Sequence, residues 1–272
     1  MKEIRKYIVL FVLMPMALCA QESSVELFSV PLSDPVKPGK VIVDQISGSI
    51  HVEAYEGKEV IVKATIGNEK AHYEGGQDNA PDGMKRVQGS PVNISAEERN
   101  NVVQIVNEQW NKVTNLDIKV PVNFSLKLST INEGNITVKG VKGELEISNV
   151  NGGVTLTEVS GAATVDTVNG DVRVQFNRVH NNAPMAFSSL NGDLDISFPR
   201  SVKANLKMRS DMGGIYTDFE MAVDNPLPVV NTERTGGTYK VKMEQWVYGK
   251  INGGGPEMLF KTFNGDIKIH AK

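Results

Sequence analysis

The chain has 272 residues, of which 40% are hydrophobic, 6% aromatic and 22% charged, with a formal net charge of −3. This length suits one large domain or two small ones. The mildly acidic balance, with no basic cluster, argues against nucleic acid or an anionic membrane surface as the main partner.

The N-terminus has the organisation of a secretory signal peptide. Three basic residues lie within residues 2–6, and residues 7–18 form an apolar run. That run is too short to anchor a mature protein in a membrane, and no second stretch reaches the necessary length. We expect residues 1–20 to be a signal peptide cleaved after Ala20. The mature chain, 21–272, is then exported to the periplasm, the outer-membrane surface or the medium, with no transmembrane segment.

Cys19 leaves a second interpretation of the N-terminus open, in which the mature protein is a lipoprotein. Leu18 precedes this cysteine, however, at a position where lipoprotein signals carry a small residue. If cleavage follows Ala20, the mature chain has no cysteine, and disulfides cannot stabilise it.

The first apolar alternations follow the N-terminal segment and are then interrupted. Gly39 and Gly48 each precede a short run in which every second residue is apolar, as in a half-buried strand. Residues 68–101 lose this pattern and contain paired glycines, Asp82-Gly83 and prolines. The composition predicts a long polar insertion at 68–101, after which strands resume.

The centre of the chain is a nine-residue repeat. From Gly134 to Phe176 it reads GNITVKGVK, GELEISNVN, GGVTLTEVS, GAATVDTVN and GDVRVQF. The third, fifth and eighth positions of each unit are apolar. We expect the residues at all three positions to be buried in the core. The eighth-position residues are Val141, Val150, Val159 and Val168. Each unit then consists of one short strand and one turn.

The strands of the repeat can be arranged in two ways, as antiparallel hairpins or as a parallel stack. A hairpin at Asn151-Gly152 would pair Ile147 with Leu156, but it would also pair Leu145 with Glu158. Parallel stacking of equivalent positions places apolar residues on apolar residues throughout. We therefore predict an all-β fold, a β-solenoid or β-roll with about two strands and 18–22 residues per coil. A β-sandwich of hairpins is the alternative.

The frame returns in the C-terminal third of the chain. Asn191-Gly192, Asn252-Gly253 and Asn264-Gly265 repeat the same turn, and Asp211-Met212-Gly213 is a degraded copy of it. The apolar residues of the last units are larger, which predicts that they cap the stack or fill a widening core.

Metal-binding patterns are weak. No two of the histidines, His51, His72, His180 and His270, lie within four residues of each other, so no zinc motif is present. Asp171, Asp193 and Asp266 each follow an Asn-Gly turn, and stacked aspartates bind calcium in some β-rolls. The same position in other units is not acidic, so we expect a turn-forming role for these residues.

Sequence motifs for catalysis are lacking as well. The chain has no glycine-rich phosphate loop before a helix and no GxSxG elbow. We predict no catalytic, cofactor-binding or metal-binding residues, and no cofactor. A polysaccharide-cleaving β-helix enzyme would need Asp, Lys and Arg residues gathered in one groove from distant units.

The repeated segments NVNGGVTL, TVNGDVRV, SLNGDLDI and TFNGDIKI resemble a family of bacterial exported β-strand-repeat domains of unknown function, described as adhesin-like. The early segment ISGSIHVEAYEGKEVIVKA shares the likeness, which covers nearly all of the mature chain. The resemblance implies an all-β fold and export, and the family has no catalytic residues to transfer.

These observations lead to three hypotheses about function. The first is a non-enzymatic cell-envelope or surface protein that binds a glycan or protein ligand through a solenoid face. The second is a carbohydrate-active β-helix enzyme. The third is a periplasmic partner of an envelope-signalling system. Exposed strand edges at the ends of the stack can also drive self-association.

Overall fold

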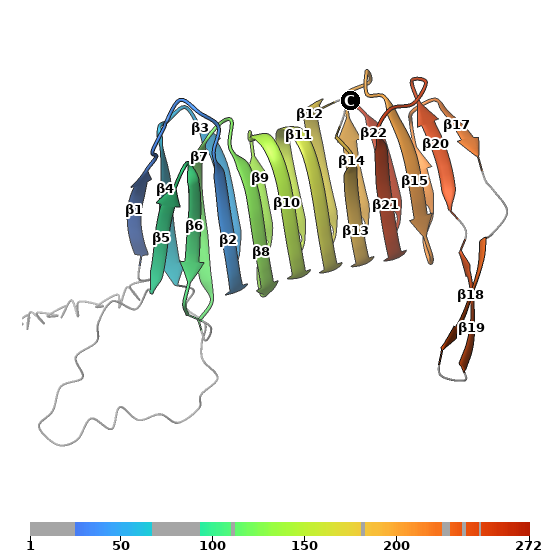
Figure 1. Cartoon of the computed structure of the whole chain (residues 1–272), viewed down its shortest axis with the longest axis horizontal. Helices are drawn as coiled ribbons and strands as arrows, with labels where there is room; N and C mark the ends of the chain where they lie inside the picture. The colour runs from blue at the N-terminus through green and yellow to red at the C-terminus, as the bar shows by residue number, and fades with distance from the viewer. Residues whose placement is uncertain are drawn as a thin grey trace, which may run out of the picture.

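The structure is a computed structural model that describes residues 25–66, 93–109, 112–180, 183–224, 229–235, 238–244 and 246–272. All regular elements in these ranges are β-strands, which confirms the all-β prediction (Figure 1). The described ranges therefore hold no helix of the length and apolarity needed to cross a membrane. The predicted signal peptide lies outside them.

The strands form two faces of an elongated stack (Figure 1). We call the first face sheet 1; in spatial order it contains β5 (Ile94–Arg99), β6 (Val102–Asn107), β2 (Lys40–Ser47), β8 (Ser125–Asn132), β10 (Lys142–Asn151), the end of β11 (Val154–Asn169), β13 (Met185–Asn191), β21 (Glu257–Asn264), β15 (Ala204–Ser210), β20 (Val247–Ile251) and β17 (Met221–Asp224).

The second face, sheet 2, contains the strands that follow each turn. In spatial order these are β1 (Val25–Pro31), β4 (Glu59–Ile66), β7 (Thr114–Pro121), β3 (Ile50–Tyr55), β9 (Ile136–Lys139), the start of β11, β12 (Val172–Val179), β14 (Leu194–Phe198), β22 (Ile267–Ala271) and β16 (Ile215–Thr217). A separate hairpin, β18 (Val229–Thr235) with β19 (Thr238–Glu244), projects near the C-terminal end of the stack.

The register of the central strands confirms the solenoid and rules out the hairpin alternative. Ile147 of β10 is aligned in parallel with Val165 of β11, and Leu156 is aligned with Val174 of β12. Equivalent positions of successive coils are 18 to 22 residues apart, as between Lys142 and Ser160. Each coil contributes one strand to each sheet, and their inward side chains form one continuous core.

The spatial order of the coils differs from the chain order at both ends. The first coil, β2 with β3, lies between β6 with β7 and β8 with β9. The last coil, β21 with β22, lies between β13 with β14 and β15 with β16. Antiparallel strands close the ends, with β4, β1 and β5 at one end and β20 and β17 at the other.

The large residues of the last coil fill the core and do not cap it. Phe260 stacks on Phe187 with ring centroids 5.3 Å apart, and Phe176 stacks on Phe198 at 5.2 Å. All four rings are buried. The Asn252-Gly253 turn is also not a coil corner, because it joins β20 and β21, which flank β15 on opposite sides.

The prediction that every eighth-position residue is buried is half wrong. Val141 and Val159 are buried, whereas Val150 and Val168 are partly exposed. The difference comes from the backbone. Glu158 has a φ of 56°, which interrupts the alternation and turns Val159 inward. No such residue precedes Val150 or Val168, so strict alternation continues and each points outward.

The predicted polar insertion at 68–101 lies mostly outside the described residues. Its last part is described, and residues Ile94–Arg99 form strand β5, paired antiparallel with β6. Regular structure therefore resumes before the predicted end of the insertion.

Candidate functional site

Six strands of sheet 1 end in a common four-residue pattern at the edge where the chain turns into sheet 2. We call this the Asn-Gly edge. The pattern is an outward polar residue, a buried polar residue, an outward apolar residue, and then Asn or Ser. The six endings are Asp44–Ser47, Ser129–Asn132, Ser148–Asn151, Asp166–Asn169, Ser188–Asn191 and Lys261–Asn264.

The buried polar residue of five endings fixes the turn of the neighbouring coil, whereas Gln45 of the first ending donates to the Gly48 carbonyl of its own turn at 2.7 Å. The Thr167 hydroxyl donates a hydrogen bond to the Gly152 carbonyl at 3.1 Å, and the Thr262 hydroxyl donates to the Gly192 carbonyl at 3.0 Å. Equivalent bonds run from Thr130 to the Gly48 carbonyl, from Asn149 to that of Gly134 and from Ser189 to that of Gly170. These bonds satisfy carbonyls that the stack would otherwise bury without partners.

The outward apolar residues form a continuous stripe along the Asn-Gly edge. We call it the apolar stripe; it consists of Ile46, Ile131, Val150, Val168, Leu190 and Phe263. Register places them side by side on neighbouring strands. Leu190 and Phe263 are 48% and 47% exposed, so these side chains are available to a ligand. The stripe ends at Asp211, which directly follows β15 and whose backbone N–H donates to the carbonyl of Thr262, the residue before Phe263.

The terminal residues of the same endings form an asparagine ladder beside the apolar stripe. The amide nitrogen of Asn151 donates to the side-chain oxygen of Asn132 at 3.2 Å. Asn169 donates to Asn151, and Asn191 donates to Asn169, both at 2.9 Å. Asn264 continues the row in register. The ladder fixes the orientation of each carboxamide relative to the next.

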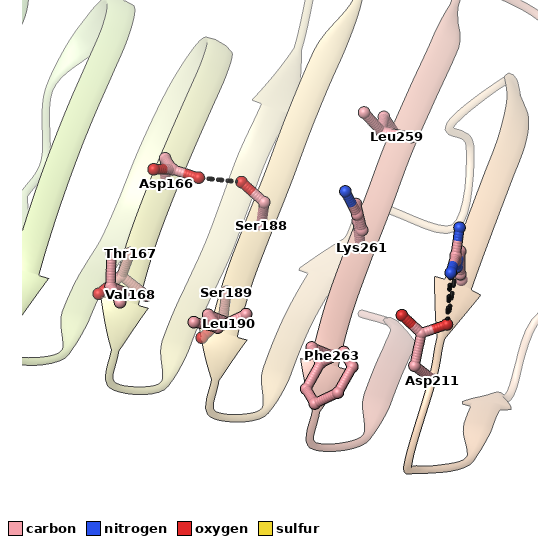
Figure 2. A pocket seen from close by; sticks show the side chains of 11 residues that line it. Asp166, Thr167, Val168, Ser188, Ser189, Leu190, Asp211, Leu259, Lys261 and Phe263 are labelled. Atoms are coloured by element: carbon pink, nitrogen blue, oxygen red, sulfur yellow. Dashed lines mark hydrogen bonds and ion pairs between the residues drawn. The ribbon is translucent and has the colours of Figure 1, made fainter. Parts of the chain in front are cut away.

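The C-terminal part of the apolar stripe borders a groove of about 660 Å³ on the outer surface of sheet 1 (Figure 2). Figure 2 shows Val168, Leu190 and Phe263 along one side, next to the turns. The lining residues come from four neighbouring strands, β11, β13, β21 and β15; they are Asp166, Thr167, Val168, Ser188, Ser189, Leu190, Arg209, Asp211, Leu259, Lys261 and Phe263.

Charged groups in the groove are mostly paired with neighbours. The Arg209 guanidinium contacts the Asp211 carboxylate at 2.7 Å, and the Ser188 hydroxyl donates to Asp166. Arg209 also lies 5.7 Å from the centre of the Trp246 ring. Within the described ranges, the Lys261 ammonium has no ion pair. The groove therefore offers one unpaired cation beside apolar and hydroxyl groups.

The aspartates after the Asn-Gly turns are structural on the sheet 2 side of this edge. The Asp171 carboxylate accepts the backbone N–H of Asp193 at 3.0 Å, and the Asp193 carboxylate accepts that of Asp266 at 2.8 Å. The Lys268 ammonium, 2.8 Å from Asp193, lowers the pKa of that carboxyl below its ordinary value of 3.8, and the Asp266 N–H adds to the effect. These carboxylates hold successive turns together.

The histidines do not converge. His51 lies on β3, His180 follows β12 and His270 lies on β22, where its Nε2 is 3.4 Å from Asp195; His72 lies outside the described residues. Among the residues that the structure describes, no group of three or more His, Cys, Asp or Glu side chains is placed to hold a metal ion.

Sequence reasoning missed the apolar stripe and the asparagine ladder, because it assigned Val150 and Val168 to the core. The signal was present in the four-residue endings. A polar residue such as Thr167 at an inward position of the alternation, followed by Val168 and Asn169, indicates a buried hydroxyl and an outward apolar side chain.

Comparisons with known proteins identify a family for the chain and two similar solved structures. No curated protein matches the chain. Similar solved structures include that of a "putative cell adhesion protein" from Clostridium sporogenes, which is 14% identical and covers 92% of this chain and 100% of its own, with a TM-score of 0.44. A "putative adhesin" from Bacteroides fragilis is 13% identical and covers 90% of this chain and 96% of its own, with a TM-score of 0.45. A family model described as Toastrack DUF4097 matches residues 17–270, and the chain therefore belongs to this family, as the resemblance of its repeats implied.

Proposed function

We propose that the chain is a non-enzymatic, adhesin-like binding protein of the cell envelope or surface, and that its glycan or protein ligand contacts sheet 1 at the groove. The observation that carries this proposal is the combination in one groove of exposed apolar side chains, such as Leu190 and Phe263, with the polar groups of Lys261 and Ser188. Such a combination is typical of binding sites, in which apolar contact supplies affinity and a few polar groups supply specificity.

The rigidity of the surface supports a binding role. The groove is built on strands whose neighbours fix their register, and the turns beside it are held by buried hydrogen bonds such as that from Thr167 to Gly152. A ligand therefore meets side chains that are already positioned, and little conformational entropy is lost when it binds.

The groove does bring together Asp166, Arg209, Asp211 and Lys261, the residue types that a polysaccharide-cleaving enzyme requires. Their arrangement nevertheless supports a carbohydrate-active enzyme less well than a binding site. Asp166 and Asp211 both line the groove, but β13 and β21 separate their strands. At the usual strand spacing they are about 14 Å apart along the sheet. Glycosidases hold their two catalytic carboxyl groups about 5–9.5 Å apart. Asp211 is also engaged with Arg209.

The location of the protein separates an adhesin from a periplasmic partner of a signalling system. The test is protease shaving of intact producing cells, with lysed cells as the control. We expect cleavage on intact cells, which is the result for a surface-displayed protein. Cleavage that requires lysis would place the protein in the periplasm and would contradict the adhesin-like role in favour of the signalling one.

The groove itself is tested with purified protein on a panel of immobilised glycans and extracellular-matrix proteins. Phe263→Ser removes the exposed ring from the groove and is expected to reduce binding about tenfold or more. Val106→Ser is the matched control, because Val106 is 38% exposed on β6, away from the groove. Equal binding by both variants and the unmodified protein would show that the groove is not the binding surface.

A further inference from the structure

We infer that the ligand is a linear, uncharged polysaccharide that lies across successive coils along the Asn-Gly edge. The inference rests on the proposed binding function and specifies its ligand class. We call the proposed site the track; it comprises the outward polar residue, the apolar residue and the terminal Asn or Ser of the six four-residue endings. The groove is the C-terminal part of the track.

The track repeats at the spacing of the strands. Neighbouring strands are about 4.8 Å apart, which is close to the length of one pyranose residue in an extended chain. Each coil presents the same three kinds of group in the same order, as Ser148, Val150 and Asn151 do on β10. In an extended β-1,4-linked polymer, successive units are related by a two-fold screw, so the polymer can make the same contacts in every second coil.

The apolar stripe fits one face of such a polymer. A pyranose ring presents a face of C–H groups, and this face packs against apolar or aromatic side chains in binding sites. Phe263 supplies an aromatic ring at the C-terminal part of the track, and Ile131 and Leu190 supply aliphatic surface along it. The stripe is one side chain wide and six strands long, as a single polysaccharide chain requires.

The asparagine ladder fits the hydroxyl groups at the edge of the ring. A carboxamide has two N–H donors and two acceptor positions on its oxygen. Asn151 donates one N–H to Asn132 and accepts one from Asn169. Asn169 in turn donates one N–H to Asn151 and accepts one from Asn191. One donor and one acceptor per coil are left over. A sugar hydroxyl, which both donates and accepts, matches this pair.

The charge of the track favours an uncharged ligand. Three of the six outward polar residues of the track are ionisable, namely Asp44, Asp166 and Lys261; they differ in sign, no two of them lie on neighbouring strands, and Asp166 accepts a hydrogen bond from Ser188. An anionic or cationic polymer would find no row of opposite charges there.

The geometry of the face also favours a polysaccharide over an extended peptide. The backbone hydrogen bonds of a sheet lie in its plane, so the outer face offers side chains and no free backbone groups. A peptide on this face therefore could not form the backbone hydrogen bonds that it gains when it adds as a strand at a sheet edge.

The experiment measures the affinity of the purified mature chain for fluorescently labelled cello- and chito-oligosaccharides, in a series from disaccharide to hexasaccharide. The track spans about 24 Å, so affinity should rise with each added sugar unit. Ile131 lies on the track beyond the groove. Ile131→Ser should therefore weaken hexasaccharide binding about tenfold and leave disaccharide binding unchanged, whereas Phe263→Ser should weaken both.

Controls separate binding from folding. Val102→Ser, on β6 beside Lys40 and away from the Asn-Gly edge, should change neither affinity, and thermal unfolding followed by circular dichroism checks that each variant is folded. Ile131→Thr, which keeps a β-branched side chain, replaces Ile131→Ser if the serine variant unfolds. Affinity that is independent of oligosaccharide length, or hexasaccharide binding that neither Ile131 variant weakens, would overturn the inference.

The inference and the proposed function fail in different ways. If the uncharged oligosaccharides do not bind, but Phe263→Ser still reduces binding to a protein or charged glycan of the panel, the polysaccharide inference is wrong and the groove remains a binding site. If neither the oligosaccharides nor the panel bind in a manner that depends on Phe263, both are wrong.

Discussion

The backbone carbonyl oxygen of Gly152 lies 2.2 Å from the position that a Cβ atom on Gly170 would occupy. The two glycines are equivalent positions of successive coils at the Asn-Gly edge, and the turns reach this separation because Gly170 has no side chain. The glycine spacing in the sequence therefore reflects a steric requirement of the stack.

The first prediction concerns this close approach. Gly170→Ala should lower the free energy of unfolding by about 3 kcal/mol, because the methyl group overlaps a backbone oxygen that the stack holds in place. Gly153→Ala is the control. Its Cβ would meet the Asp171 carbonyl at 3.3 Å, and we expect a cost below about 1 kcal/mol. Urea unfolding followed by circular dichroism measures both, and similar costs would contradict the steric explanation.

The second prediction concerns the buried hydroxyl of Thr167. Thr167→Val keeps the shape of the side chain and removes the hydrogen bond to the Gly152 carbonyl. The loss should cost about 1–2 kcal/mol, since a buried carbonyl is left without this donor. Thr164→Val, on an exposed position of the same strand, should be nearly neutral. Chemical denaturation of the two variants provides the comparison, and a neutral Thr167→Val would show that the hydroxyl contributes nothing.

The third prediction concerns the core. Leu156 is buried and aligned with Val138 and Val174 of the neighbouring coils. Leu156→Asp places a carboxylate among apolar side chains and should abolish the folded protein, because an unpaired buried charge is very costly. Thr157→Asp, at the next and partly exposed position, should fold. Limited proteolysis distinguishes them, and a protease-resistant Leu156→Asp protein would contradict the solenoid core.

The fourth prediction concerns acid stability. The Lys268 ammonium and the Asp266 backbone N–H lower the pKa of Asp193, so its ionised form stabilises the folded state. This contribution is complete above the ordinary aspartate pKa and is lost as the pH falls through the lowered value. Asp193→Asn should therefore reduce stability at neutral pH and flatten its decrease below about pH 4.

Lys268→Met provides a second check, because it removes the ammonium that lowers the pKa of Asp193 and leaves the carboxyl group in place. It should weaken the same part of the acid dependence. An Asp193→Asn protein whose unfolding free energy follows the same acid profile as the unmodified chain would show that the contact with Lys268 does not stabilise the fold.

The sequence was sufficient to predict the stack because two local requirements repeat along it. Glycine is needed where turns approach each other, as at Gly152 and Gly170, and alternation is needed where strands bury one face, as at Leu145 and Ile147. Both requirements act over a few residues, so they produce a nine-residue pattern that is visible in the sequence.

The direction of Val150 and Val168 could not be predicted from apolarity alone. It depends on whether the alternation of inward and outward side chains is interrupted before the turn. At Glu158 a positive φ interrupts it, and the presence of a glutamate does not predict that conformation. The apolar stripe was missed for this reason. Its position follows from the buried side chain that donates a hydrogen bond to a turn carbonyl, such as Thr167, because the next residue must then point outward.

The spatial order of the coils was also beyond the sequence pattern. The coil that contains Phe260 has the same frame as its neighbours, so the frame does not distinguish a place at the end of the stack from one inside it. Shape complementarity decides. Phe260 packs against Phe187 and Phe198, which both belong to the neighbouring coil, β13 with β14.

The interior position of the last coil has a consequence for biogenesis. Strand β15 pairs with β21 in parallel and never with β13, so the chain cannot assemble its coils one after another in the order of synthesis. The segment Glu257–Ala271 must be synthesised before the neighbouring coils can close on it. Without this segment, β13 and β14 lack the strands that cover one of their sides, so the C-terminal part of the core is completed only after the last strands have been synthesised.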